Sequence, residues 1–377
     1  MKKDTSIGYT AAGVDSRLEE AGLSELGAWV NRTFALNPNK PILPLGYFAN
    51  VIKLSPEQGL AISTDGVGTK LLIAQALGKY DTVGIDCVAM NANDVICVGA
   101  RPISMVDYVA VQKIEPGFLG EIGKGLYAGA EAAGINIPGG EIAQVAEMIR
   151  DDVRQGYGFD LVGTCVGTVH PDRIIIGQAI EPGDAVVGIA SSGIHSNGLT
   201  LARRVLFRES MAALAEHVTA LGRTLGEELL APTHIYVREV MQMLDDGLAI
   251  RALIHITSDG LLNLARVASE TGYVIDAPLE PQPIFPMIQR RGSIPDPEMF
   301  RVFNMGTGFC VIVAPPDADR VVTIAARHGR RARVIGYTVR DPEKRVWLPT
   351  CKLIGKGDSF EPSHDRPPAR PAAGGAR

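Results

Sequence analysis

The sequence lacks a long hydrophobic run. Hydrophobic residues make up 46% of its 377 residues, yet no stretch approaches the roughly 18 uninterrupted apolar residues of a membrane-spanning helix. It also lacks a basic run: 37 Lys and Arg against 42 Asp and Glu give a net charge of −5, which argues against nucleic acid as the main partner. The segment that follows Met1 is polar, so we expect no signal peptide.

Cysteine is scarce, and its spacing indicates no pairing. The five cysteines form no C-x-x-C motif and no even set; they are Cys87, Cys97, Cys165, Cys310 and Cys351. This pattern disfavours a zinc site, a nucleophilic cysteine and a disulfide framework. We therefore expect a reducing, cytoplasmic location.

What the sequence does contain is an alternation of short apolar runs with longer amphipathic ones, which is typical of an α/β fold. In the first half the pattern predicts strands at 60–63, 104–111 and 159–169 and helices at 69–77, 83–98 and 118–133. In the second half it predicts strands at 184–190, 309–314, 334–338 and 345–348 and helices at 197–206, 235–244, 260–270 and 318–328, with a helical excursion at 209–228.

A polar break at His170-Pro171-Asp172 divides these two halves. We therefore predict an N-terminal domain over residues 1–170 and a C-terminal domain over residues 171–350. The Pro-, Ala- and Gly-rich composition of 366–375 cannot bury enough apolar area to offset chain entropy, which predicts a disordered tail over residues 351–377.

A glycine turn follows the first predicted strand. Asp65 ends that strand, and Gly66 and Gly68 allow the backbone to turn tightly and to approach a ligand. Thr69 can cap the next helix, whose free N–H groups favour an anion. Lys70 comes after the threonine, so the segment is not a Walker A loop. An ordinary strand–turn–helix with Asp65 as a turn residue remains the alternative.

The helix at 83–98 carries oxygen-bearing side chains on one face. At about 100° per residue, Asp86, Asn93 and Asp94 share a face that has no Lys or Arg. Such a face suits a hard metal ion, which takes oxygen ligands. Interaction with the helix dipole would explain Asp86 in the first turn, but not Asp94 near the end.

A third motif places Glu141 after two glycines, Gly139 and Gly140, which permit close approach of a ligand to the backbone. Alone it indicates no more than a loop. Together with Asp65 and Asp94 it favours phosphoryl transfer, because that chemistry needs oxygen ligands for Mg²⁺ and loops around phosphates.

The fourth motif, Ser191–Gly198, joins a predicted strand to a helix. Ser196 or Asn197 can cap this helix, and the free N–H groups with neighbouring hydroxyls such as that of Ser192 suit a phosphate. His195 is a candidate acid, base or hydrogen-bond donor. A capped loop with a structural histidine is the alternative.

These motifs occur in the order found in one family. From about Tyr9 to Leu348 the sequence resembles the phosphoribosylformylglycinamidine cyclo-ligases, also called aminoimidazole ribonucleotide synthetases. The segments that carry the resemblance are Tyr9–Asp15, Ser63–Lys70, Val83–Asp94, Gly99–Pro102, Asp107-Tyr108, Gly139–Glu141, Ser191–Gly198, Leu230–Thr233 and Phe303–Gly308.

The resemblance implies a layered α/β fold with two domains, in which the N-terminal domains of a homodimer pair into a β-barrel and the C-terminal domain is α/β. It implies ATP and Mg²⁺ as cofactors, and a small-molecule substrate, formylglycinamidine ribonucleotide, with no nucleic-acid or membrane partner. The γ-phosphate of ATP would activate the formyl amide oxygen, an internal amine would attack the activated carbon, and phosphate would leave as the imidazole closes.

The resemblance also assigns roles to individual residues. The implied Mg²⁺ ligands are Asp65, Asp94 and Glu141. The implied ATP- and substrate-binding residues are Asp65, Gly66, Gly68, Thr69, Asn93, Gly139, Gly140, Glu141, Ser192, Ser196 and Asn197. The implied catalytic residues are Lys70, Asp94 and His195.

Three segments depart from the family pattern. The residues after Glu141, 142–147, lack the usual threonine, second carboxylate and Pro-Gly turn. Asp259 interrupts a Thr-Gly-Gly-Gly pattern, where its charge would repel an anionic ligand. Residues 46–49 contain fewer glycines than the corresponding glycine-rich segment of the family. Two alternatives therefore stay open: a superfamily enzyme that phosphorylates a different amide, carbonyl or phosphate acceptor, and a non-catalytic paralogue that binds nucleotide.

Overall fold

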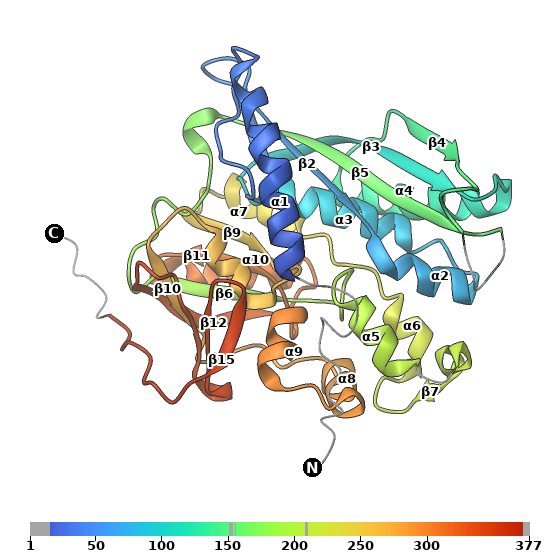
Figure 1. Cartoon of the computed structure of the whole chain (residues 1–377). Coiled ribbons are helices and arrows are strands. Elements are labelled where there is room, and N and C mark those ends of the chain that lie inside the picture. Colours follow the sequence, from blue (N-terminus) through green and yellow to red (C-terminus); the bar gives the residue numbers. More distant parts are fainter. Residues whose placement is uncertain (1–15, 151–153, 155, 208–209, 372–377) are drawn as a thin grey trace.

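The computed structural model describes residues 16–150, 154, 156–207 and 210–371, and Figure 1 shows two sheets with their helices. The elements of the first half are α1 (Ser16–Val30), η1 (Asn31–Ala35), β1 (Asn50–Lys53), β2 (Gly59–Gly66), η2 (Gly68–Lys70), α2 (Leu71–Leu77), α3 (Val83–Ile96), β3 (Arg101–Val111), α4 (Pro116–Ala133), β4 (Gly140–Gln144) and β5 (Phe159–Val169).

The elements of the second half, up to the last helix, are η3 (Pro171–Arg173), β6 (Ala185–Ala190), α5 (Leu199–Leu206), η4 (Met211–Ala215), β7 (His217–Val218), β8 (Arg223–Thr224), α6 (Leu225–Leu229), α7 (Val237–Asp245), β9 (Ile250–His255), η5 (Gly260–Arg266), β10 (Thr271–Val274), α8 (Ile284–Gly292), α9 (Asp296–Val302), β11 (Thr307–Val313), η6 (Pro315–Asp317) and α10 (Ala318–Arg327). The chain continues through β12 (Ala332–Arg340), β13 (Val346–Leu348), η7 (Pro349–Cys351), β14 (Leu353–Lys356) and β15 (Ser359–Pro362).

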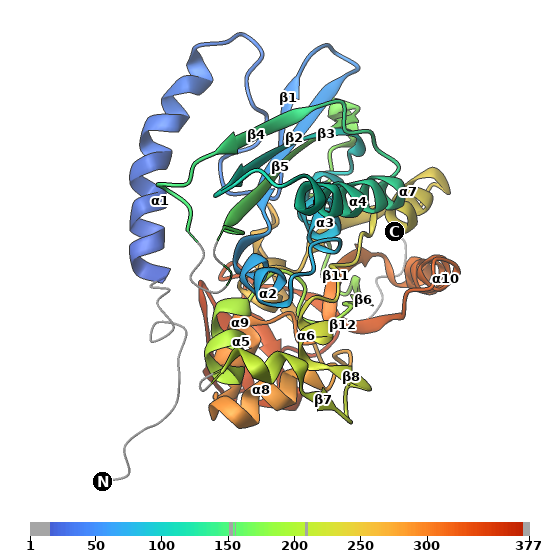
Figure 2. The ribbon, with the colours of Figure 1, turned by 90° about the vertical axis from the view of Figure 1, so that its right-hand side faces the viewer.

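The first half forms a five-stranded sheet in the order β1-β2-β5-β3-β4, with only β3 and β4 parallel. Residues along β5 are alternately buried and more exposed, as expected for a strand with one covered face. Helices α3 and α4 lie on the covered side, and α1 lies on the other side of the sheet (Figure 2). One row of the register runs Asp65–Gly163–Asp107–Gly140 across four strands, on the side facing α3.

The second half forms an eight-stranded mixed sheet in the order β15-β14-β13-β10-β12-β6-β11-β9. Its central strands β6 and β11 are buried at every residue, because the sheet is covered on both faces. Strand β9 lies at the edge of this sheet, and its last residue, His255, contacts Asp94 on α3. The two halves therefore meet along α3.

Helices α3 and α4 approach each other closely at glycines. A Cβ atom at Gly84 of α3 would overlap the backbone of Leu126 and Gly125 of α4. A Cβ at Gly129 would lie 2.9 Å from the Val88 side chain. This contact holds α3 against the sheet, and α3 carries the acidic and amide residues of the candidate site.

The fold confirms the main sequence-based expectations. The chain has two mixed α/β halves, and β5 and α3 begin at the predicted residues. The described part of the chain contains no closed sheet. The prediction for 260–270 is wrong in type, because residues 260–266 form a 3-10 helix and β10 begins at Thr271. The excursion at 209–228 contains only short elements in its described residues.

The predicted disordered tail is also wrong over much of its length. Strands β14 and β15 form a hairpin on β13, and Leu353 and Phe360 are buried in the core. Farther along, the Tyr337 hydroxyl donates a hydrogen bond to the Pro368 carbonyl at 2.8 Å. The prediction of disorder failed because composition alone does not show which apolar residues a hairpin will bury. Residues 372–377 and the Tyr9–Asp15 motif lie outside the described residues.

All five cysteines are free thiols. Cys87, Cys97, Cys165 and Cys310 are buried, and burial raises the pKa of each of these thiols. Cys351 is partly exposed. The cytoplasmic location stays a prediction. Separately, none of the helices in the described ranges combines the length and apolar character needed to cross a bilayer.

Candidate functional site

Asp65 lies at the end of β2, where the two halves of the chain meet. Asn91 of α3 fixes its backbone: the Asn91 Oδ1 accepts from the Asp65 N–H at 2.8 Å, and the Asn91 Nδ2 donates to the Asp65 carbonyl at 3.0 Å. The Gly66 N–H donates to the Asp65 Oδ1 at 2.7 Å. Asn91 therefore holds the Asp65 backbone, and the Gly66 N–H holds its carboxylate.

Asp94, three residues beyond Asn91, is hydrogen-bonded to the C-terminal half. Its Oδ1 lies 2.8 Å from Nδ1 of His255, and His255 is fully buried while Asp94 is 15% exposed. The preceding residue, Asn93, is fully buried; its amide donates to the His234 carbonyl and accepts from the Tyr236 N–H. Asn93 thus joins the two halves, and its predicted contact with nucleotide stays a prediction.

The electrostatics of this region suit a cation. Burial, followed by repulsion from Asp94, raises the pKa of the Asp65 carboxyl to about 6. Two carboxylates that repel each other in a partly buried place are stabilised by a shared positive ion. Mg²⁺ is often bound by one or two carboxylates together with phosphates of a substrate, so the pair fits this ion.

The structure does not bring Glu141 to this pair. Glu141 stands opposite Tyr108 in the β3–β4 register, on the face of the sheet turned away from α3, whereas Asp65 lies on the face toward α3. The set of three predicted metal ligands is thus corrected to two within one chain. Among the described residues, no group of three or more Asp, Glu, His and Cys side chains is placed to hold a metal. Gly139 and Gly140 lie beside Glu141, at the start of β4.

Lys70 is buried rather than open to a ligand. Its Nζ donates to the Asp86 Oδ1 at 2.8 Å and to the Ala231 carbonyl at 2.7 Å, and the residue is fully inaccessible to solvent. Thr69 does not cap α2; its hydroxyl lies 3.1 Å from that of Thr200 in the C-terminal half. Gly68, with φ +71°, has open space where a Cβ would be, so a ligand can approach the turn there.

The Ser191–Gly198 loop is built differently from the prediction. The N-cap of α5 is Gly198, with φ +78° and no side-chain cap, so neither Ser196 nor Asn197 caps this helix. Ser196 is buried and directs its hydroxyl to Asp86, while Ser192 and Asn197 are half-buried. No side chain therefore caps the first N–H groups of α5, the kind of groups that favour an anion.

His195 is enclosed within this loop. Its Nε2 accepts hydrogen bonds from the Ser192 N–H at 3.1 Å and the His234 N–H at 3.5 Å. Burial, with repulsion from neighbouring cations, holds the pKa of His195 well below its usual range. The neutral ring therefore carries its proton on Nδ1, and Nε2 is not free to take a proton from a substrate. Within the described ranges His195 shapes the loop, and its catalytic role stays a prediction.

Asn304, in the Phe303–Gly308 motif, supports the same loop through hydrogen bonds. Its Nδ2 donates to the carbonyls of Gly193 and Ile194, and its Oδ1 accepts from the Ser191 hydroxyl at 3.0 Å. The sequence placed this motif among the segments that carry the family resemblance, but it did not indicate the support role. It also missed His255, because β9 was not predicted, although the apolar run before this histidine was available as a signal.

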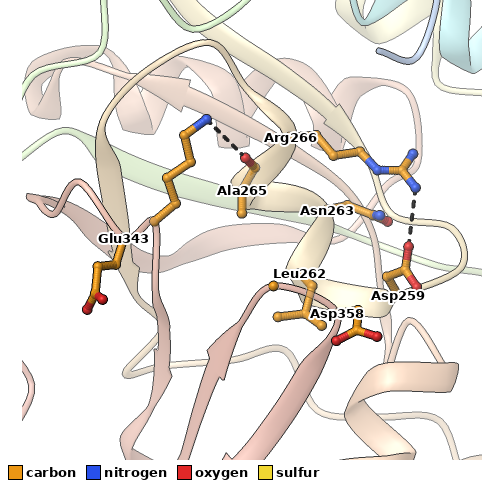
Figure 3. Close-up of a pocket in the computed structure, with 9 residues that line it drawn as sticks. Asp259, Leu262, Asn263, Ala265, Arg266, Glu343 and Asp358 are labelled. Atoms are coloured by element: carbon orange, nitrogen blue, oxygen red, sulfur yellow. Dashed lines mark hydrogen bonds and ion pairs between the residues drawn. The ribbon is translucent and has the colours of Figure 1, made fainter. Parts of the chain in front are cut away.

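Asp259 does not present a free charge to a ligand. It forms an ion pair with Arg266 at 3.2 Å, and both line a pocket of about 320 Å³ at η5 (Figure 3). The Arg266 guanidinium in turn lies 5.3 Å from the ring centre of Phe48. The expected repulsion by Asp259 is therefore largely neutralised, and Arg266 contacts both Asp259 and Phe48.

A second cleft, of about 370 Å³, lies beside the Ser191–Gly198 loop. Its walls include Ser192 and His234 together with two guanidinium groups, those of Arg223 and Arg330. Each arginine is paired with a glutamate, Arg223 with Glu228 and Arg330 with Glu239. The cleft is therefore polar without a large net charge.

Comparison with known families matches both halves of the chain. The model described as "AIR synthase related protein, N-terminal domain" matches residues 46–169, and the corresponding C-terminal domain model matches residues 181–349. The phosphoribosylformylglycinamidine cyclo-ligase of Methanothermobacter thermautotrophicus is 44% identical over 345 residues, 92% of this chain and 98% of that protein. That of Methanocaldococcus jannaschii is 44% identical over 351 residues, 93% and 96% of the two chains.

Solved structures share the fold at low sequence identity. PurL of Thermotoga maritima in complex with ADP gives a TM-score of 0.54 at 17% identity, over 90% of this chain and 50% of that one. A chain of the HypE–HypF complex gives a TM-score of 0.58 at 18% identity, over 85% and 95% of the two chains. These likenesses concern the fold alone.

Proposed function

The chain belongs to the AIR synthase family, and from this membership we propose that it is a phosphoribosylformylglycinamidine cyclo-ligase of purine biosynthesis. It uses ATP to convert formylglycinamidine ribonucleotide into aminoimidazole ribonucleotide, with release of ADP and phosphate. The observation that carries this conclusion is the extent of the match: 44% identity runs through nearly the whole of both chains, so both halves of the site are included.

In this proposal the N-terminal half holds the nucleotide. Asp65 and Asp94 hold the Mg²⁺ ion, which when bound supplies positive charge to the phosphates of ATP. Asn91 holds the backbone of Asp65 in place through two hydrogen bonds. The backbone at Gly68 can approach the phosphates, because no atom lies within 4 Å of the place where its Cβ would be, whereas a Cβ at Gly66 would lie 3.5 Å from the Val162 side chain.

The C-terminal half would hold the ribonucleotide. The first N–H groups of α5 carry no side-chain cap, which suits the ribose phosphate of the substrate. Ser192 and Asn197 lie at the edge of this loop and are accessible to a ligand. His195 and Asn304 keep the loop in shape through the hydrogen bonds to its backbone.

The chemistry then depends on position. Transfer of the γ-phosphoryl group to the formyl amide oxygen makes the amide carbon electrophilic, and the amine of the same molecule attacks it as phosphate leaves. Holding the amine beside the activated carbon makes ring closure an intramolecular step, which is a large part of the rate enhancement. The chain contributes two facing sets of binding groups, one on each side of the junction.

We also propose that the protein is a homodimer, in which the open faces of two five-stranded sheets close into a barrel. This face carries exposed apolar side chains on β3, namely Ile103, Val106 and Tyr108, which are 41–46% exposed. Helix α1 has further exposed apolar residues, among them Leu23, Leu26 and Trp29. Exposed apolar side chains in these numbers favour a protein–protein interface.

The dimer proposal predicts that a charge at the centre of this face separates the subunits. We expect Val106→Glu to shift the molar mass measured by light scattering from that of a dimer toward that of a monomer, because each subunit would bury a carboxylate in the interface. Tyr127→Glu is the matched control, since Tyr127 is 70% exposed on α4, on the covered side of the sheet. A Val106→Glu protein that stays dimeric would contradict this interface.

The cyclo-ligase function is tested by an assay that measures phosphate and aminoimidazole ribonucleotide together. With ATP, Mg²⁺ and formylglycinamidine ribonucleotide we expect one phosphate for each product molecule. ATP turnover without the imidazole product would favour a different acceptor. Absence of ATP binding in calorimetry would favour a non-catalytic paralogue.

A further inference from the structure

A buried carboxylate, that of Asp86, connects the two halves of the chain at the candidate site. Its Oδ1 accepts from the Lys70 ammonium at 2.8 Å, from the Thr233 N–H at 2.8 Å and from the Thr233 hydroxyl at 2.7 Å. The Ser196 hydroxyl donates to the same oxygen at 3.2 Å. Asp86 and Lys70 have no solvent-accessible surface, and the side chains of Ser196 and Thr233 are buried around them.

These four residues come from the segments that the proposed reaction must align. Lys70 ends the turn that begins at Asp65, and Asp86 lies on α3, two turns before Asp94. Ser196 belongs to the loop that precedes α5, and Thr233 follows α6. Besides the contacts made by Thr69, Asn93 and Asp94, these four segments are therefore joined at one atom, the Asp86 Oδ1.

The geometry of Lys70 argues against direct contact with phosphate. Its ammonium is enclosed by Asp86 and by the Ala231 carbonyl, at 2.7 Å. Turning it toward a nucleotide would leave the Asp86 carboxylate buried without its counter-charge, which is a strongly unfavourable state. The Asp86 Oδ2 already has no hydrogen-bond partner among the described residues, so this carboxylate depends on the donors at Oδ1.

We propose that Lys70 and Asp86 are positioning residues, which fix the distance between the Asp65–Lys70 turn and the Ser191–Gly198 loop so that phosphoryl transfer reaches the amide oxygen and not water. This inference rests on the proposed cyclo-ligase function. In such a reaction a small displacement of one reactant reduces the rate strongly, while each substrate still binds to its own half.

The test uses Lys70→Met, which keeps the length of the side chain and removes its charge, and Thr233→Val, which keeps the shape and the backbone N–H but removes the hydroxyl. For Lys70→Met we expect kcat to fall about 100-fold while the KM for ATP changes less than about 3-fold. For Thr233→Val we expect a smaller fall of the same kind. In both, more than one phosphate should be released for each product molecule, because water replaces the displaced amide.

Two comparisons decide the outcome. Thr350→Val, at an exposed threonine remote from the junction, is the control and should keep the one-to-one ratio. If Lys70 instead contacts phosphate, Lys70→Met will weaken ATP binding in calorimetry at least 10-fold more than ADP binding, and Thr233→Val will have no effect. That result would overturn the proposal. The proposal would also fail if both variants kept the wild-type kcat and released one phosphate for each product molecule.

Failure of the proposed function would look different, because wild-type protein would then form no imidazole product. The calorimetric comparison of ATP with ADP still tests the role of Lys70 in that case. Should Lys70→Met fail to fold, Thr233→Val alone carries the test, since it leaves the Lys70–Asp86 ion pair in place.

Discussion

Asp65→Asn is expected to lower kcat/KM for Mg-ATP by roughly 100-fold or more, the usual cost of losing one charge-stabilising group. The same substitution should stabilise the nucleotide-free protein at pH 7.5. Burial and the nearby Asp94 raise the pKa of the Asp65 carboxyl to about 6, so its ionisation opposes folding. The amide oxygen of asparagine can still accept from the Gly66 N–H, and the turn therefore keeps its shape.

The sign of the pH dependence follows from this raised pKa. As pH rises from about 4 to about 6, the folded protein binds more protons at Asp65 than the unfolded chain does, so wild type loses stability over this window. The loss amounts to at most about 3 kcal/mol and is complete above pH 6. We therefore expect Asp65→Asn to melt higher than wild type at pH 7.5, and the difference to shrink toward pH 4.

The matched control is Asp172→Asn, at a carboxylate whose side chain is 88% exposed, which should change neither turnover nor melting temperature. A destabilised Asp65→Asn protein, or a gain in stability that does not vary with pH, would refute the electrostatic account of the site. Turnover at the wild-type level would refute Asp65 as a magnesium ligand.

Gly84→Ala is expected to destabilise the protein by about 3 kcal/mol or more, the upper range for an overpacked core. The added methyl would overlap the backbone of Leu126 and Gly125, and backbone atoms cannot rotate away as a side chain can. Helix α3 would have to move, and with it Asn91 and Asp94. We expect a lower midpoint in thermal and chemical denaturation, together with weaker Mg-ATP binding.

Gly120→Ala, on the outer side of α4, is the control for this prediction. A Cβ at Gly120 meets no other atom within 4 Å, and alanine in a helix interior is favoured over glycine by about 0.5–1 kcal/mol. Gly120→Ala should thus be slightly stabilising. If both alanine variants melt at the wild-type temperature, then α3 and α4 do not cross as closely as the structure indicates.

Local patterns were sufficient to predict the elements that carry Gly163 and Asp94. The alternation of apolar and small residues in β5 and the 3.6-residue period of α3 are properties of contiguous sequence. Strands β9, β10 and β14 and helices α8 and α9 were not predicted, because each is short and takes its stability from residues distant in the chain. The hairpin at β14 and β15 is the clearest case.

The errors at the candidate site have a common cause, which is that sequence spacing does not show the register of a sheet. Glu141 was grouped with Asp65 because both are acids that follow or accompany glycines. Successive side chains of a strand point to opposite faces of the sheet, and the β3–β4 register places the Glu141 side chain on the open face. Lys70 and Asp86 are buried by residues more than 100 positions away in the sequence, Ala231 and Thr233. The burial of this ion pair could therefore not be predicted from the local motif.

The unequal burial of the thiols makes this chain convenient for spectroscopy. The thiolate, not the thiol, attacks a maleimide, and the four interior cysteines are both shielded from solvent and held in the protonated form. Cys351, beside the β14–β15 hairpin, is accessible in part, and its partial burial also raises the pKa of its thiol. A fluorophore or spin label can therefore be attached at one defined point of the native sequence, without first removing other cysteines.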